Sequence, residues 1–421
     1  MPSPKSRPRR RPGRGAPGGR WWRAVGALPG AEVRQSLVAL GLNSTTSLVA
    51  GAVLGSMTAT LAEFPGLLVL VPAAIGLRGN VFSTFGSRIS TALHAGQLTV
   101  ALRRRTLLGQ NVEASLVLTL AMSVVIAVVA WVVAVVIGVE QPTPPTVLVL
   151  ISVLGGLVAS LVVLGVTLVM IRGAVRFGWD LDDVVAPVVS TFGDVVTLPA
   201  LWLAARLARV EGAASPLGVV LGVVALVVVA RAARTPHEAL RRVVRESWPI
   251  LGAAALVSTL AGVVLETRLA ALQVLPALLV LQPALTSSAG ALGGILASRT
   301  ASGLHLGYAL PSLRPGRQVR ADAGFVAGLA LPVAVLNGIG ASVLARLLGL
   351  DGPTTATLVG VAVVAGVLAA AFALVVAYAT SVAAFAHGVD PDSFGIPAVT
   401  SSVDLAGVVA LVATASLFSL L

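Results

Sequence analysis

The sequence lacks cysteine altogether, which excludes disulfide bonds, thiol chemistry and thiolate metal sites. Histidine and tyrosine are also scarce, with four and two copies in 421 residues, so few side chains are available for general acid–base chemistry. The sequence shows no recognisable serine–histidine–aspartate set and no HExxH zinc motif. We therefore expect a protein that is not an enzyme and that holds no cofactor.

Charge is scarce as well, because 11% of the residues are charged whereas 57% are hydrophobic. That hydrophobic share exceeds the composition of ordinary soluble domains. Apolar runs such as residues 123–138 and 216–230 approach the roughly 20 residues that a helix needs to cross a bilayer, and similar runs recur along the chain. The alternation typical of transmembrane strands is missing. The sequence therefore predicts an all-α polytopic membrane protein.

We expect about eleven transmembrane helices, at residues 36–62, 66–97, 111–138, 146–171, 185–206, 215–232, 249–270, 275–307, 323–348, 355–386 and 395–420. With the N-terminus in the cytoplasm, 22 lysine and arginine residues fall on the inner side and four on the outer side. Such an excess marks the cytoplasmic face. We expect a multi-pass protein of the plasma membrane whose C-terminus lies outside.

Nine of the basic residues precede residue 35, in a segment rich in proline and glycine that we expect to be disordered. Nucleic-acid binding is one interpretation of such an arm. A basic segment before the first apolar run ordinarily holds an N-terminus in the cytoplasm and against anionic lipid, so we expect the bilayer and no nucleic acid as its partner.

Two stretches of the chain repeat at an offset of about 210 residues. Residues 65–96 align with residues 276–307 without a gap, and 13 of the 32 positions are identical. At a shift of 210, residues 178–194 fall on residues 388–404, so that Asp194 matches Asp404. Internal repeats of this kind indicate duplicated structural units.

Each repeat holds five expected spans, and the additional span at residues 215–232 gives both repeats the same orientation. We therefore expect two parallel five-helix repeats related by a pseudo-twofold axis along the membrane normal, where a pore or site can form. The expected domains are a disordered basic cytoplasmic arm at residues 1–33, a first repeat at 34–210, a linker helix with a basic loop at 211–247, and a second repeat at 248–421.

Asp194 and Asp404 are the first candidates for ion binding. A carboxylate within a span costs about 2.5–3.5 kcal/mol on insertion scales, so each is expected to face the protein interior or water. On a helix each shares one face with hydroxyl residues and a proline. These residues are Pro187, Ser190 and Thr191 in the first repeat and Pro397, Thr400 and Ser401 in the second.

Two such aspartates facing each other disfavour their charged forms unless a cation lies between them. Oxygen ligands without histidine or cysteine suit Mg²⁺, Ca²⁺ or Mn²⁺. We therefore predict a metal site of Asp194 and Asp404 with the four hydroxyl residues, and pore-lining roles for the two prolines. The alternative is structural: each aspartate caps a kinked helix or pairs with an arginine.

Other repeated polar residues have weaker claims. The acidic residues at the expected helix starts are either N-terminal helix caps or a cytoplasmic vestibule that gathers cations. They are Asp180, Asp182, Asp183, Asp390 and Asp392. The repeated SR-x5-H motif carries Arg88, Arg299, His94 and His305, for which we favour structural roles. Gly79, Asn80 and Gly290 are candidate pore-lining residues, and the mate of Asn80 is Ala291.

The stretch P-x-LL-x-L-x-PA-x5-GN, the following SR-x-ST, and DxD-x4-P-x2-[ST][ST]-x2-D resemble motifs of the MgtE-type magnesium transporters. The likeness is closest to the tandem solute-carrier branch, in which two MgtE-like membrane domains are fused, and it covers about residues 35–420 in two copies. It implies Mg²⁺ transport through a pore between the halves, with Asp194 and Asp404 as pore carboxylates. Two departures are the absent GN pair in the second repeat and the lack of room for the cytoplasmic sensor domains of bacterial MgtE.

We therefore predict a divalent-cation transporter or channel, with Mg²⁺ as the first candidate ion. A Na⁺- or H⁺-coupled divalent-cation exchanger is the alternative within transport. A non-transporting membrane scaffold is the alternative from another class. The expected partners are divalent cations and the lipid bilayer. The two repeats form an internal pseudo-dimer, so we expect that a monomer suffices, and a homo-oligomer stays open.

Overall fold

The computed structural model is predominantly α-helical in the residues that it describes. These are residues 31–94, 101–103, 105–177, 181–210, 212–305, 307, 309–312, 314–387 and 391–421. No strand occurs in these residues, so the predicted all-α class is confirmed. The chain divides into two compact units, residues 1–39 and residues 40–421. In the first unit only the start of one helix is described, so the expected basic arm lies almost wholly outside the described residues.

Six helices follow one another in the first half and recur in the same order in the second. The first set is α2 (Ala31–Ser56), α3 (Thr58–Glu63), α4 (Leu67–His94), α5 (Leu107–Val136), α6 (Pro145–Phe177) and α7 (Leu181–Leu207). Helix α8 (Ala214–Ala233) follows, and then the second set: α9 (Glu238–Glu266), α10 (Leu269–Val274), α11 (Ala277–His305), α12 (Arg317–Leu347), α13 (Thr355–Ala386) and α14 (Pro391–Leu417).

Within the described residues, ten helices are long and apolar enough to cross a membrane. The eleventh expected span, at residues 185–206, coincides with α7, which has 27 residues but is not among the ten. The expected spans at 36–62 and 249–270 were each predicted as one helix. The structure divides them, because the short helices α3 and α10 follow α2 and α9 before the chain enters α4 and α11.

Local sequence signals explain several helix ends. Thr106 caps the start of α5, where its hydroxyl accepts a hydrogen bond from the backbone N–H of Gly109 at 3.2 Å. Thr354 caps α13 in the same way through the N–H of Thr357 at 3.3 Å. The chain turns from α3 into α4 at Gly66, whose φ of 89° is in the left-handed region that favours glycine.

Equivalent close contacts join the two halves, as a pseudo-twofold relation between them requires. A Cβ added at Gly51 on α2 would collide with the backbone carbonyl of Val280 on α11. A Cβ added at Gly262 on α9 would collide with the carbonyl of Val69 on α4. The two contacts are equivalent under the repeat, because Gly262 lies 211 residues after Gly51 and Val280 lies 211 residues after Val69. Small residues let helix backbones approach this closely, so the first helix of each half crosses the second helix of the other half.

A buried carboxylate joins the halves at a third point. The side chain of Glu266, at the end of α9, accepts a hydrogen bond from the backbone N–H of Gly66 at 2.8 Å, just before α4 begins. The first N–H groups of a helix have no partner within the helix, and an acidic side chain there is also favoured by the helix dipole. The end of α9 therefore helps to fix the start of α4 in the other half.

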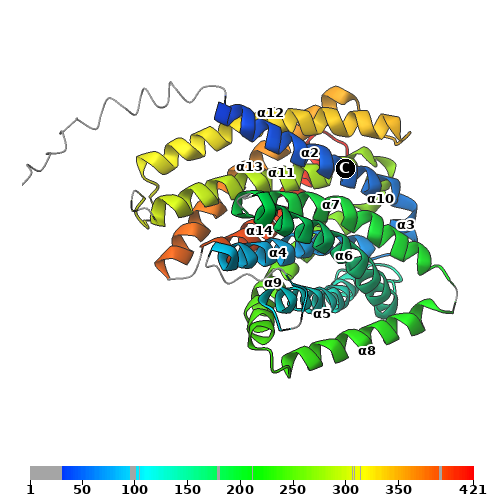
Figure 1. The fold of residues 1–421 in the computed structure, drawn as a ribbon. Coiled ribbons are helices and arrows are strands. Elements are labelled where there is room, and N and C mark those ends of the chain that lie inside the picture. The colour runs from blue at the N-terminus through cyan, green and yellow to red at the C-terminus, as the bar shows by residue number, and fades with distance from the viewer. Residues whose placement is uncertain are drawn as a thin grey trace, which may run out of the picture. The chain divides into compact units, whose positions relative to one another are not determined.

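Helices α4 and α11 form the interior of their halves. Helix α4 packs against α5, α7 and α9, and α11 packs against α12, α13 and α14. Their first turns are fully buried at Leu67, Leu68, Leu278 and Leu279. Helix α8 instead lies along α5 and α6 (Figure 1). Little of α8 is buried, and its exposed valine and leucine side chains suit contact with lipid.

We predict opposite effects for two glycine-to-alanine substitutions in α9. Gly262→Ala is expected to lower the free energy of unfolding by about 1–3 kcal/mol, because the added methyl group overlaps the Val69 carbonyl. Gly252→Ala is the matched control, since a Cβ there meets no atom within 4 Å and alanine has the higher helix propensity. Thermal unfolding in detergent measures both, and equal shifts would contradict the close helix crossing.

Candidate functional site: two aspartates at the junction of the halves

Asp194 on α7 is buried and Asp404 on α14 is partly buried, and each has an equivalent contact within its own half. The Oδ2 atom of Asp194 accepts a hydrogen bond from the hydroxyl of Ser47 on α2 at 3.0 Å. The Oδ2 atom of Asp404 accepts one from the hydroxyl of Ser258 on α9 at 2.9 Å. Ser47 and Ser258 are themselves 211 residues apart. Each aspartate is therefore held by a serine from the first helix of its own half.

Each aspartate also faces the second helix of the opposite half. Asp194 accepts a second hydrogen bond from the hydroxyl of Ser287 on α11 at 2.9 Å. The residue equivalent to Ser287 in the first half is Gly76 on α4, and a Cβ there would lie 3.3 Å from Oδ2 of Asp404. Both carboxylates therefore lie where the two halves meet, but Asp194 has one more hydroxyl donor than Asp404.

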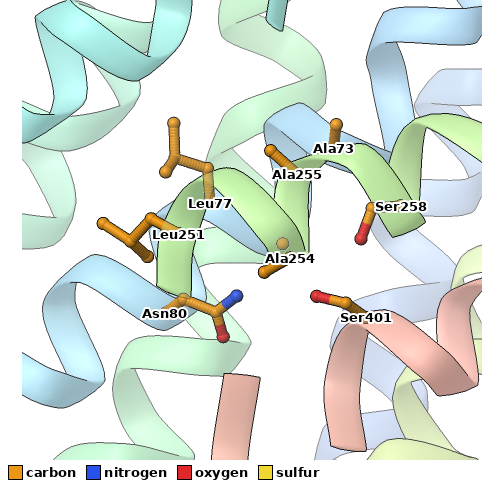
Figure 2. Close-up of a pocket in the computed structure, with 9 residues that line it drawn as sticks. Ala73, Leu77, Asn80, Leu251, Ala254, Ala255, Ser258 and Ser401 are labelled. Carbon is orange, nitrogen blue, oxygen red and sulfur yellow. The ribbon is translucent and has the colours of Figure 1, made fainter. Parts of the chain in front are cut away.

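A small pocket lies beside Asp404, between α4, α9 and α14. Figure 2 shows Asn80 and Ser401 on two sides of this space, with Ala254 and Ser258 from α9 close by. The space is too small to admit a water molecule. The amide oxygen of Asn80 accepts a hydrogen bond from the hydroxyl of Thr400 at 3.2 Å, which links α4 to α14 across the halves.

Ser401 contributes an unsatisfied hydroxyl to the same pocket. Its side chain is 2% exposed, and within the part of the chain that the structure describes its oxygen has no hydrogen-bond partner. An unpaired buried hydroxyl costs free energy. Ser401 therefore presents an unpaired hydroxyl oxygen to this closed pocket, and its part in a metal site stays a prediction.

The remaining predicted site residues fall on the expected helices. Thr191 on α7 is half-buried, Gly79 and Gly290 occupy α4 and α11, and Pro397 is buried within α14. The side chains of Ser190, Pro187, Asp182, Asp183 and Asp392 are outside the described part of the structure. Asp180 and Asp390 lie wholly outside the described residues, so the vestibule and the alternative of helix capping stay predictions.

Sequence reasoning missed four polar residues that contact the aspartates or their partners: Ser47, Ser258, Ser287 and Asn43. A signal for two of them was present, because the 211-residue offset places Ser47 on Ser258. Asn43 and Ser287 have no such signal, since their equivalents are Ala254 and Gly76.

The site offers a cation few charged ligands and several neutral oxygens. In the described residues no three histidine, aspartate or glutamate side chains come together. A fully dehydrated divalent ion needs about six or more oxygen ligands, whereas Mg²⁺ commonly keeps several of its waters and binds through one or two carboxylates. The donor types, two carboxylates with hydroxyl and amide oxygens, are therefore those that a hydrated Mg²⁺ ion contacts through its waters, although the pocket beside Asp404 is closed in this conformation.

Arg78 introduces a buried positive charge next to the predicted pore-lining residues. Its side chain is 1% exposed, and its guanidinium donates to the carbonyl of Ala74 on its own helix and lies 3.4 Å from the hydroxyl of Ser123 on α5. The guanidinium fits against Gly156 on α6, where a Cβ would collide with it. Among the described residues no carboxylate pairs with Arg78.

Of the repeated arginines, Arg299 pairs with a carboxylate, whereas Arg88 contacts a serine hydroxyl. Arg299 on α11 forms an ion pair with Asp322 on α12 at 3.1 Å and lies 4.7 Å from the ring centre of Phe325. Arg88 on α4 donates to the hydroxyl of Ser247 on α9 at 3.3 Å. The side chains of His94 and His305 are outside the described part of the structure.

Comparison with known proteins defines the class. The family model for MgtE, described as divalent cation transporter, matches residues 71–204 and 282–414. The two matched regions cover more than half of the chain and begin 211 residues apart, in agreement with the internal repeat. Each region contains one of the two aspartates. The chain therefore belongs to the MgtE family.

Within that family, the chain is similar to members of solute carrier family 41. It is 30% identical over 257 residues to member 2 from Xenopus laevis and 28% identical over 263 residues to member 2 from Homo sapiens. These alignments cover 59% of this chain but 45% and 44% of the relatives, so the chain matches less than half of their length. Member 3 from Rattus norvegicus is 25% identical over 259 residues, covering 60% of this chain and 55% of the relative. No solved structure matches the chain.

We predict a strong coupling between Arg78 and Gly156. Gly156→Ala is expected to destabilise the protein by about 1–3 kcal/mol, because the methyl group overlaps the guanidinium. In an Arg78→Ala background the same substitution should cost less, since the guanidinium is gone and only the Ser123 hydroxyl, 2.6 Å from the added Cβ, still overlaps it. Thermal unfolding of the two single variants and the double variant measures the coupling. Additive losses would show that the two residues do not meet.

Proposed function

We propose that this protein transports divalent cations, with Mg²⁺ as its main substrate, along a path between its two repeats. The observation that carries the proposal is the pair of aspartates at equivalent positions, one buried and one partly buried, each hydrogen-bonded to serine rather than to a basic residue. Membership of the MgtE family, whose description is divalent cation transporter, supports it. A transport role also agrees with the lack of a catalytic residue set in the sequence.

The contacts of the aspartates favour an ion site over a structural role. A buried aspartate that served only as a structural counter-charge would be expected to pair with arginine or lysine. Among the described residues, the partly exposed carboxylates of Glu63 and Asp322 form ion pairs with arginine, whereas Asp194 and Asp404 form none. Hydroxyl donors leave the negative charge of Asp194 and Asp404 without a counter-charge, so a cation is attracted to the junction of the halves where they lie.

The position of the aspartates favours a path between the halves. Asp194 contacts Ser287 of the second half, and Asp404 lies against Gly76 of the first half. Thr400, Ser401 and Asn80 extend the polar surface along α14 and α4. We propose Asp194 and Asp404 as the main cation ligands, with Ser190, Thr191, Thr400 and Ser401 beside them on the same helices.

Membrane placement completes the proposal. We propose that the protein resides in the plasma membrane with its N-terminus in the cytoplasm, where its excess of arginine and lysine residues is favoured. A single chain holds both repeats and so supplies both aspartates. Sodium- or proton-coupled exchange is the second candidate mode of transport, and a non-transporting scaffold is the remaining alternative.

The first test is the removal of each negative charge without a change in shape. Asp194→Asn and Asp404→Asn are each expected to reduce Mg²⁺ uptake into proteoliposomes by at least about 100-fold, because the site loses the charge that attracts the cation. Glu63→Gln is the matched control: it removes one negative charge from a half-exposed ion pair with Arg209, which is worth about 0–1 kcal/mol. Uptake at the wild-type level in an Asp194→Asn, Asp404→Asn double variant would rule out the aspartate site.

A second experiment separates a channel or uniporter from a coupled exchanger. Uptake is measured in liposomes that have neither a Na⁺ nor a H⁺ gradient and contain only a Mg²⁺ gradient. Since the proposed site consists of cation ligands without an assigned proton carrier, we expect uptake to persist. Uptake that appears only after a Na⁺ or H⁺ gradient is imposed would establish coupled exchange instead.

A further inference from the structure

Two asparagine side chains lie next to the aspartates, and both come from the first half of the chain. On the Asp194 side, the amide oxygen of Asn43 on α2 is 3.2 Å from the hydroxyl of Ser287, which donates to Asp194 at 2.9 Å. On the Asp404 side, Asn80 on α4 lines the pocket that also contains Ser258, the hydrogen-bond partner of Asp404 (Figure 2). Each carboxylate therefore has one amide nearby.

The two amides are not related by the repeat. At the offset of 211 residues, Asn80 corresponds to Ala291 on α11. Asn43 corresponds to Ala254 on α9, and Ala254 lines the Asp404 pocket. The second helix therefore supplies the amide beside Asp404, whereas the first helix supplies the amide beside Asp194. The helix that supplies no amide carries an alanine at the equivalent position, which is Ala291 on the Asp194 side and Ala254 on the Asp404 side.

We propose that Asn43 is a further ion-contacting residue. On the Asp194 side its amide takes the place of the one that the second repeat lacks, because Ala291 stands where the first repeat has Asn80. The inference rests on the proposed function, because it assigns a ligand to the same cation site. The substrate it would contact is a hydrated divalent cation, and the contact is a hydrogen bond from a metal-bound water to the amide oxygen.

The hydrogen bonds around Ser287 make the amide oxygen available. The Ser287 hydroxyl lies within hydrogen-bonding distance of both Asp194 Oδ2 and Asn43 Oδ1, but a hydroxyl has one proton to donate. When Ser287 donates to the carboxylate, the Asn43 oxygen is left as an acceptor directly beside it. A carboxylate and an adjacent amide oxygen are two acceptors for the waters around Mg²⁺, which sheds those waters reluctantly.

A deletion and a rescue test the proposal. We expect Asn43→Ala to raise the Mg²⁺ concentration for half-maximal uptake about tenfold, as for loss of one hydrogen bond to a charged group. Adding Ala291→Asn to that variant returns the amide to the second helix and should lower the half-saturation concentration again. Asn43→Leu, which keeps the side-chain volume, serves if the alanine variant does not fold.

Thr45→Ala is the matched control on α2, because Thr45 is exposed and its hydroxyl bonds to the carbonyl of Gly41 on its own helix at 2.8 Å. Its half-saturation concentration should equal that of the wild type. A purely structural Asn43 would change thermal stability without moving the half-saturation concentration, and Ala291→Asn would then rescue nothing.

The outcomes separate this proposal from the one on which it rests. If Asp194→Asn abolishes uptake while Asn43→Ala and Asn43→Leu keep the wild-type half-saturation concentration, the transport function stands and the role of Asn43 is wrong. If the wild-type protein takes up no divalent cation, both proposals fall together. Asn43→Ala could also raise the half-saturation concentration without Ala291→Asn lowering it again. That result would show that the amide is needed on α2 and that an amide on α11 cannot take its place, which would overturn the proposed replacement.

Discussion

The structure depends on keeping two carboxylates inside an apolar bundle without a basic partner. Within a low-dielectric medium such groups need hydrogen-bond donors. Asp194 and Asp404 obtain these donors from serines on the first helix of each half, and Asp194 obtains another from the opposite half. The first helices must therefore lie against α7 and α14, which requires them to cross the second helices of the opposite half at very close range.

Glycine makes that crossing possible. Gly51 and Gly262 allow α2 and α9 to touch the backbones of α11 and α4, and Glu266 fixes the start of α4 from the end of α9. The half-sites are thus assembled by contacts between the repeats rather than within one repeat. This arrangement explains why the candidate site is found at the junction of the halves, and why neither repeat encloses its aspartate alone.

The features that depend on pattern and repetition could be predicted from the sequence. Hydrophobic runs predicted the all-α membrane class, and the offset of about 210 residues paired Asp194 with Asp404. The partners of the aspartates were less predictable, because Ser47 and Ser287 lie 147 and 93 residues from Asp194 in the chain and meet it only through helix packing. The division of two expected spans was also missed, because the breaks at Met57 and at Thr267–Arg268 contain neither proline nor glycine.

The placement of the two asparagines has a consequence for the relation between the halves. A pair of two first halves would carry four amides at the positions of Asn43 and Asn80, whereas a pair of two second halves would carry alanine at all four of these positions. The halves are therefore not interchangeable at the junction, although their folds match. Each carries side chains there that the other lacks, so two copies of either half would not rebuild the junction that the joined chain forms.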